Sequence, residues 1–248
     1  MNSVDIAFEQ ISDIVGKDNF IQNEETLSFY STDVFVSSKE KPLAVVRPND
    51  SYELIKIVQA CIANNVSLIV RGGGASYTGG YLPINNNTII IDSQNLKKIE
   101  INEEDMYVTV EPGVTWLELY EALSPLGLRT PFWGPFSGRV ATIAGSMSFH
   151  ALSHGTNNAV SADSLSSLQV IIGTGEVIET GSQGANENSS RFFRHYGPDI
   201  GGLFLGDSGA LGVKTRVTLK LRKKPEGFAA ISFGFPDFKN LFLAMRDI

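Results

Sequence analysis

The 248-residue sequence has little of two residue types on which many catalytic and structural sites depend. It contains one cysteine, Cys61, and three histidines, His150, His154 and His195. A single cysteine excludes a disulfide within the chain and is compatible with a reducing compartment. Because Cys61 lies on an apolar helical face and has no basic neighbour that would stabilise a thiolate, we expect a buried structural thiol.

The scarcity of histidine disfavours two catalytic classes. Gly206-Asp207-Ser208-Gly209 is similar to the nucleophile loop of serine proteases, but no histidine lies in a context that would supply the base. His150 and His154 are four residues apart, yet no H-E-x-x-H pattern joins them and no third ligand is evident. We therefore expect neither serine hydrolysis nor a metal site.

Concentrated positive charge and long apolar runs are also missing. The net charge is −7, and the densest basic stretch is Arg222-Lys223-Lys224. Since nucleic-acid binding requires clustered Lys and Arg, we expect no nucleic-acid partner. No run of about 18 apolar residues is present, and the N-terminus lacks the basic-then-apolar order of a signal peptide. The expected location is the cytoplasm, or the membrane periphery, without a transmembrane segment.

Glycine is concentrated in one loop that follows an apolar run. Residues 66–70 predict a buried strand, and Arg71-Gly72-Gly73-Gly74-Ala75-Ser76-Tyr77-Thr78-Gly79-Gly80 follows it. Adjacent residues without Cβ let backbone N–H groups converge on a phosphate. The loop is not G-x-G-x-x-G, because Tyr77 occupies the last glycine position, and G-x-x-x-x-G-K-[ST] is absent. We predict a phosphate-binding loop of another type; the alternative is a flexible surface turn.

Hydrophobic periodicity and capping residues predict the surrounding elements. The chain should contain helices over 3–15, over 51–63 after an Asp50 cap, over 115–123 with a Thr115/Glu118 capping box, and over 239–246. Strands are expected at 43–46, 66–70, 88–92, 106–110, 213–221 and 228–235, with a hairpin formed by 168–172 and 176–179.

Two further stretches are rich in small residues and lack steady periodicity. They are residues 131–162 and 201–212, and such backbone can approach a ligand closely. The alternative is a long irregular loop. A flavin dinucleotide needs a pyrophosphate cradle, backbone contacts along its length and an apolar slot for its rings. The glycine-rich loop and these two stretches together could provide those parts.

Four motifs in this order resemble the FAD-binding domain of the vanillyl-alcohol oxidase and p-cresol methylhydroxylase superfamily. They are Arg71 to Ser76 with Gly79-Gly80, Glu111-Pro112-Gly113-Val114, Ala141-Thr142-Ile143-Ala144-Gly145, and Gly206 to Thr215. The resemblance covers about residues 40–222 and is greatest to D-lactate dehydrogenases, glycolate oxidase FAD subunits and alkyl-dihydroxyacetone-phosphate synthases. It implies an α+β fold in which two α/β subdomains form a PCMH-type FAD-binding domain, followed by the truncated start of a substrate (cap) domain.

The resemblance also implies a domain order and an activity. We expect a helical segment at 1–39, the FAD domain at 40–224 with subdomains at about 40–105 and 106–224, and the cap from 225 to 248. The expected reaction is oxidation of a 2-hydroxy acid, such as D-lactate or glycolate, by hydride transfer to flavin N5. Electrons would pass to a quinone, a cytochrome, a partner flavoprotein or O2. Catalytic residues would lie beyond Ile248, and a homo-oligomer or partner subunit is possible.

Two alternatives stay open. One is an alkyl-glycerone-phosphate synthase-like transferase that uses FAD, and the other is a flavin-binding module that is inactive without a partner chain.

The resemblance further implies which residues contact FAD. Residues 72–76 would hold the pyrophosphate, 135–146 would run along the flavin, and 209–213 would help hold the two ends. The expected cofactor-binding residues are Arg71, Gly72, Gly73, Gly74, Ala75, Ser76, Gly79, Gly80, Pro112, Gly113, Pro135, Phe136, Ser137, Ala141, Thr142, Ile143, Gly145, Ser146, Gly209, Gly212 and Val213.

Three places depart from the family pattern, and one of them is Ala159-Val160 where the family typically has Tyr-Gly ahead of Asp163. Ala75 stands where some relatives carry a histidine joined covalently to flavin, so we expect non-covalent FAD. Ala144 replaces the first glycine of the usual T-I-G-G, and we expect its methyl group to narrow the approach to the flavin.

Overall fold

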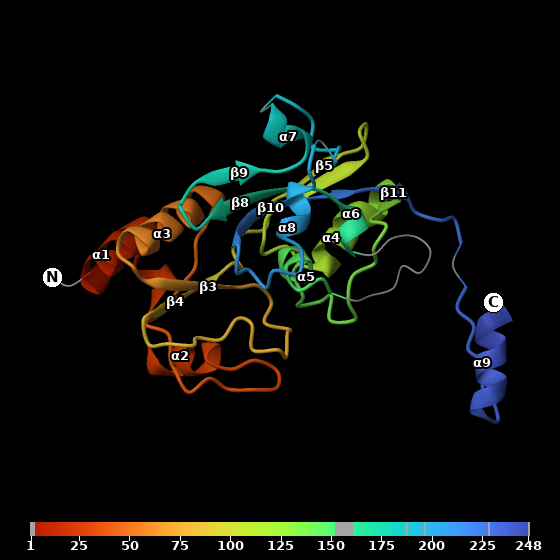
Figure 1. The fold of residues 1–248 in the computed structure, drawn as a ribbon, viewed down its shortest axis with the longest axis horizontal. Coiled ribbons are helices and arrows are strands. Elements are labelled where there is room, and N and C mark those ends of the chain that lie inside the picture. Colours follow the sequence, from red (N-terminus) through yellow and green to blue (C-terminus); the bar gives the residue numbers. More distant parts are fainter. Residues whose placement is uncertain (1–2, 152–160, 187, 196, 228, 248) are drawn as a thin grey trace.

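Two β-sheets organise the chain, and helix α3 (Ser51–Ala63) packs against both (Figure 1). The computed structural model describes residues 3–151, 161–186, 188–195, 197–227 and 229–247. The mixed helices and sheets confirm the predicted α+β class.

The first sheet has the strand order β1-β2-β4-β3. Strand β4 (Thr88–Asp92) runs parallel to both β2 (Ala44–Val46) and β3 (Ser67–Arg71), whereas β1 (Phe20–Ile21) is antiparallel to β2. Helix α3 connects β2 to β3, as the predicted strand–helix–strand unit requires, and β4 inserts between those two strands. All three parallel strands therefore end at the same edge, where β3 delivers the glycine-rich loop.

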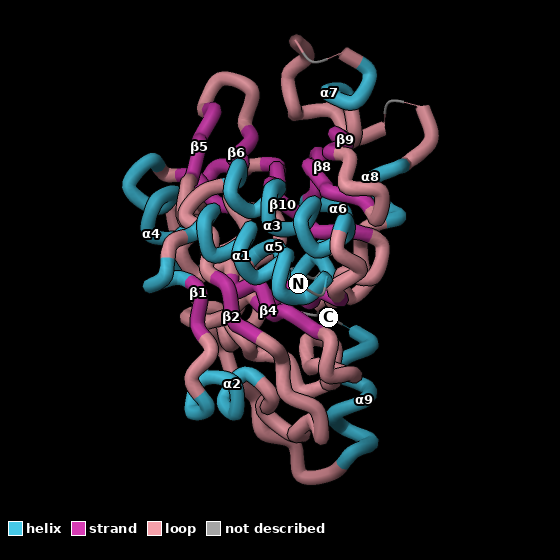
Figure 2. The backbone as a smooth tube through the Cα atoms, turned by 90° about the vertical axis from the view of Figure 1, so that its left-hand side faces the viewer, coloured by secondary structure: helices cyan, strands magenta, loops and turns pink. Residues whose placement is uncertain are grey.

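Alternating side chains of β4 face two different cores. Ile89 and Ile91 pack with α3 and α1 (Ser3–Val15), whereas Ile90 packs with Tyr30 of α2 (Glu24–Tyr30). Figure 2 shows α2 on the side of this sheet opposite α1. Cys61 is fully buried in the first of these cores, and burial raises the pKa of its thiol to about 12.

The second sheet is antiparallel throughout, in the order β5-β6-β10-β8-β9. Its strands are β5 (Ile99–Asn102), β6 (Tyr107–Val110), β10 (Gly212–Lys220), β8 (Leu165–Ile172) and β9 (Val177–Glu179). Helices α4 (Trp116–Leu123) and α5 (Ile143–Ser148) complete its core. Ile171 and Val213 instead reach the core around α3, so the two sheets share packing.

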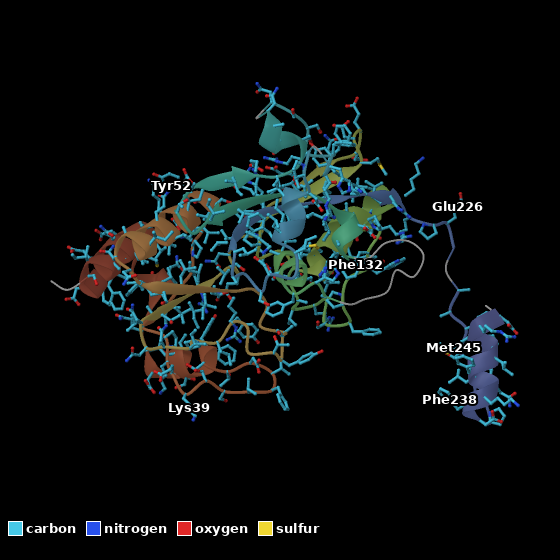
Figure 3. All side chains as sticks on the ribbon, in the orientation of Figure 1. Lys39, Tyr52, Phe132, Glu226, Phe238 and Met245 are labelled. Carbon is cyan, nitrogen blue, oxygen red and sulfur yellow. The ribbon has the colours of Figure 1, made fainter. Side chains whose placement is uncertain are left out.

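The remaining elements are short, apart from the last helix. They are the 3-10 turns η1 (Lys17–Asn19) and η2 (Ser124–Leu126), the strands β7 (Leu128–Arg129) and β11 (Arg222–Lys223), and the helices α6 (Ser161–Ser164), α7 (Ser182–Ala185), α8 (Ile200–Leu203) and α9 (Phe238–Asp247). Helix α9 lies apart from both sheets, and Figure 3 shows Phe238 and Met245 on it. No helix within the described ranges is long and apolar enough to cross a membrane.

Local capping signals were reliable predictors of helix starts. The side chain of Asp50 accepts a hydrogen bond from the Glu53 N–H at 2.8 Å, and Thr115 and Glu118 form the predicted capping box. The predicted strand at 88–92 and the predicted hairpin are also confirmed.

One predicted strand is wrong. Of the range 228–235, position 228 lies outside the described residues, and 229–235 form no strand. Ile231 and Phe233 are exposed, at 74% and 69%. A strand needs a neighbour for its backbone hydrogen bonds, and this segment has none among the described parts of the chain.

Helix α2, which no periodicity predicted, begins where the Asn23 side chain accepts a hydrogen bond from the Thr26 N–H at 2.9 Å.

Candidate cofactor site

The glycine-rich loop leaves the carboxyl end of β3 and turns twice through left-handed backbone. Gly74 and Gly79 have φ angles of +66° and +73°, a conformation that side chains with a Cβ rarely adopt. The loop runs beside the segment that follows α2, because the Val34 N–H donates to the Ser76 carbonyl at 3.4 Å.

The carbonyl groups and the N–H groups of the loop backbone differ in whether they have hydrogen-bond partners within the protein. The Tyr81 hydroxyl donates to the carbonyls of Gly74 and Ser76 at 2.8 and 3.0 Å. By contrast, the backbone N–H groups of residues 73–77 donate to no acceptor within the described ranges. Adjacent N–H groups without partners are what an anionic group such as a pyrophosphate requires, so the loop fits the predicted ligand.

The positions of Gly72 and Gly73 require glycine for a reason that the sequence did not reveal. A Cβ on Gly73 would lie 1.6 Å from the Val140 carbonyl oxygen, and one on Gly72 would lie 2.4 Å from Thr142 Oγ1. The two glycines therefore let residues 140–142 pack directly on the loop. In this way the fold brings the first and third predicted motifs together.

Thr142 connects the third motif to the second. Its hydroxyl oxygen accepts from the Gly145 N–H at 3.2 Å and caps α5, and its backbone forms an antiparallel bridge with Thr115. Ile143 N–H donates to the Val114 carbonyl at 3.0 Å. Gly113 is needed beside these contacts, because a Cβ there would lie 2.0 Å from the Ser93 carbonyl oxygen.

The fourth motif packs on the other end of α5. The N–H groups of Gly206 and Ser208 donate to the carbonyls of Met147 and Ser148 at 2.9 and 2.8 Å. Gly209 has a φ of +79° and open space around it. The first, second and fourth motifs therefore all contact the segment 140–148, which contains the third.

A buried ion pair fixes this fourth motif. Lys214 Nζ lies 2.7 Å from Asp207 Oδ1, and the two side chains are 3% and 1% exposed. Burial lowers the pKa of Lys214, against the opposing effect of Asp207. Since its carboxylate is engaged by Lys214, Asp207 is not available as the orienting acid of a protease triad.

Some of the residues that we expect to contact FAD are closely packed against other parts of the protein. A Cβ on Gly212 would lie 2.5 Å from Val170 Cγ1, and the Val213 side chain is only 5% exposed. Ser146 is buried, and its hydroxyl accepts from Trp116 Nε1 at 2.8 Å. Their roles toward FAD stay predictions, and any contact with a ligand from Gly212 or Val213 would come from backbone.

The loop 134–138 packs against the Trp116 ring on one side and carries an exposed side chain, Phe136. A Cβ on Gly134, which has a φ of +85°, would meet the Trp116 ring at 2.6 Å. Gly138 N–H donates to the Pro135 carbonyl at 2.9 Å, and Phe136 is 93% exposed. By contrast, Ala144 is buried in the core of the second sheet, where its methyl group packs against protein. The expected narrowing of the approach to the flavin stays a prediction.

Arg71 supports the loop from inside the protein. Its side chain is only 8% exposed, and its guanidinium lies 4.6 to 5.1 Å from the ring centres of Phe29, Tyr30 and Tyr81. A Cβ on Gly74 would meet Arg71 Nη2 at 2.6 Å. Arg71 therefore positions the loop as a buried cation on aromatic rings.

Sequence reasoning missed a polar cluster beside Arg71. The Tyr30 hydroxyl donates to Asp92 Oδ2 at 2.5 Å, and Arg47 Nε donates to the same oxygen at 3.0 Å. Burial, together with the bond to Asp92, raises the pKa of Tyr30. No local pattern signalled this cluster, because Arg47 and Asp92 lie 17 and 62 residues from Tyr30 along the chain.

The two histidines that the structure describes, His150 and His195, belong to no cluster of metal-ligating side chains among the described residues. His154 lies outside the described residues, and the described ones contain no group of three His, Cys, Asp or Glu side chains that could hold an ion.

A family model described as "FAD binding domain" matches residues 42–181, which is more than half of the chain. The match spans the first three predicted motifs.

Curated relatives agree with this match. Glycolate oxidase subunit GlcD of Bacillus subtilis is 30% identical over 219 residues, covering 88% of this chain and 45% of that protein. The mitochondrial D-lactate dehydrogenase [cytochrome] of Arabidopsis thaliana is 34% identical over 205 residues, covering 80% of this chain and 34% of that protein. The chain thus spans less than half the length of either relative.

A solved structure shares the fold. p-Cresol methylhydroxylase with substrate bound superposes with a TM-score of 0.79 at 21% identity, covering 91% of this chain and 44% of that one. The chain therefore belongs to the FAD-binding domain family and has the fold of the FAD-binding part of p-cresol methylhydroxylase, and FAD is its cofactor.

Proposed function

We propose that the chain is the FAD-binding part of an enzyme that oxidises a 2-hydroxy acid such as D-lactate or glycolate. The observation that carries this proposal is the alignment with relatives named for glycolate and D-lactate, over 88% and 80% of the chain. Fold likeness does not separate substrates, since structures such as p-cresol methylhydroxylase share the same fold.

We assign the pyrophosphate of FAD to the N–H groups of residues 73–77, for which no acceptor is present among the described residues. Residues 135–146 would lie along the flavin, held by the Thr142 contacts, and residues 209–213 would support the ends of the cofactor. When bound, FAD supplies the acceptor for hydride at N5. The contribution of this chain is to bind and orient it.

In this proposal, substrate recognition and the acid–base residue belong to the part of the relatives' length that this chain does not span. Residues 225–248 would lead into the substrate domain, and the exposed apolar side chains of α9 are compatible with packing there. The substrate is a small molecule, and a separate electron acceptor would reoxidise the flavin.

Anaerobic addition of D-lactate or glycolate to the FAD-loaded protein, in a form that includes the substrate domain, is expected to bleach the absorbance of oxidised flavin. L-Lactate serves as the stereochemical control and should act more slowly than D-lactate. Flavin that is bound but stays oxidised with both acids would contradict the proposal. That outcome would favour a transferase reaction without net redox change, or a module that needs a partner chain.

Denaturation of the FAD-loaded protein is expected to release all of its flavin. The methyl side chain of Ala75 has no nucleophilic atom, so it cannot form the covalent bond that histidine forms at this position in some relatives. The measurement is flavin absorbance in the supernatant after acid precipitation. Yellow colour that stays with the polypeptide would overturn this prediction.

A further inference from the structure

We propose that Asp33 is a positioning residue for the cofactor, because it holds the glycine-rich loop in the conformation that receives the FAD pyrophosphate. Asp33 belongs to a turn, residues 31–36, which we call the clamp turn. This inference rests on the proposed role of residues 73–77.

The two carboxylate oxygens of Asp33 have different partners. Oδ1 accepts from the N–H groups of Phe35 and Val36 at 2.7 and 2.6 Å and so shapes the clamp turn itself. Oδ2 accepts from the Gly79 N–H at 2.7 Å and so reaches across to the loop. These backbone donors, Val36 first, hold the pKa of Asp33 below its usual value.

The clamp turn and Tyr81 engage the loop through its carbonyl groups. Val34 N–H and the Tyr81 hydroxyl both donate to the Ser76 carbonyl, and Tyr81 also donates to Gly74. With those carbonyls fixed, the intervening N–H groups are left without partners among the described residues. A loop ordered in this way before binding loses less conformational entropy when the ligand arrives.

The clamp turn is itself tied to the first sheet. Arg71 Nη1 donates to the Thr32 carbonyl at 3.4 Å, and the guanidinium stacks on Tyr30, whose hydroxyl is bonded to Asp92. Asp92 and Arg71 are the last residues of β4 and β3. Asp33 therefore joins the loop to a fixed part of the fold, and not to another exposed loop.

The substitution Asp33→Asn separates the two functions of the carboxylate. The amide oxygen can still accept from Phe35 and Val36, but the amide NH₂ then faces the Gly79 N–H, so two donors oppose each other. We expect the Kd for FAD, measured by quenching of flavin fluorescence, to rise roughly tenfold, since a charge-assisted hydrogen bond is lost. Amide exchange at residues 76–79 of the FAD-free protein should also accelerate.

The matched control is Asp105→Asn, which makes the same charge change in the turn between β5 and β6. Asp105 Oδ2 accepts there from Asn102 Nδ2 and Ser190 Oγ, far from the loop. An Asp33→Asn protein with the Kd of this control would overturn the proposal. If Asp33→Asn lowers the melting temperature of the FAD-free protein more than the control does, amide exchange measured well below that temperature carries the test. Exchange at residues 76–79 no faster than in the control would then overturn the proposal.

Failure of the underlying assignment gives a different result. If FAD binds the wild-type protein without slowing exchange of amides 73–77, the loop is not the pyrophosphate site, and the positioning role of Asp33 is overturned with it. If FAD slows that exchange but Asp33→Asn binds FAD as the control does, only the role of Asp33 is contradicted.

Discussion

Replacing Gly73 by alanine is expected to weaken FAD binding about 100-fold or more and to lower the free energy of unfolding by about 1–3 kcal/mol. The added Cβ would lie 1.6 Å from the Val140 carbonyl oxygen, which is backbone and cannot rotate away. The loop and the segment 140–142 must therefore separate. Since the proposed site uses both segments, their separation removes contacts from two parts of the cofactor at once.

Fluorescence titration of the FAD-free variant with FAD measures this effect. Gly173→Ala is the matched control, because a Cβ on Gly173, in the turn between β8 and β9, meets nothing within 4 Å. The control should keep the wild-type affinity and stability. A Gly73→Ala protein with wild-type affinity for FAD would show that contact between the loop and residues 140–142 is not required for binding.

Replacing Lys214 by methionine is expected to lower the free energy of unfolding by about 3–5 kcal/mol. The substitution removes one member of a buried ion pair and leaves the Asp207 carboxylate, 1% exposed, without its cation. The remaining donors to that carboxylate are the N–H groups of Gly209 and Leu211, at 3.0 and 3.4 Å. They do not neutralise its charge.

Urea unfolding of the FAD-free protein measures this loss. Lys98→Met is the control, because the Lys98–Glu100 pair is exposed and an exposed pair contributes at most about 1 kcal/mol. A loss of stability in Lys214→Met no larger than in Lys98→Met would contradict the role assigned to the buried pair.

Elements with local signals could be predicted from the sequence. Asp50 and the Thr115/Glu118 pair mark helix starts through contacts within four residues, and the apolar run at 88–92 is a strand buried on both faces. The strand expected at 228–235 failed because alternation alone supplies no pairing partner. Helix α2 was missed because its cap at Asn23 precedes a mixed, weakly periodic run.

The candidate cofactor site likewise has features that the sequence predicts and features that only the fold reveals. Glycine density pointed to the loop, but the reason for Gly73 is a contact with Val140, and the order of the loop depends on Asp33 and Tyr81. These contacts join residues that are distant in sequence, so only the fold reveals them. The motif order made the cofactor predictable, whereas no residue pattern in this chain identified the substrate.

Hydrogen exchange of the protein with and without FAD tests the central claim most directly. The account predicts that FAD slows exchange of the backbone amides of residues 73–77, while those of the turn between β5 and β6 keep their rates. Stoichiometric FAD binding with unchanged exchange at residues 73–77 would contradict the claim that the glycine-rich loop holds the pyrophosphate.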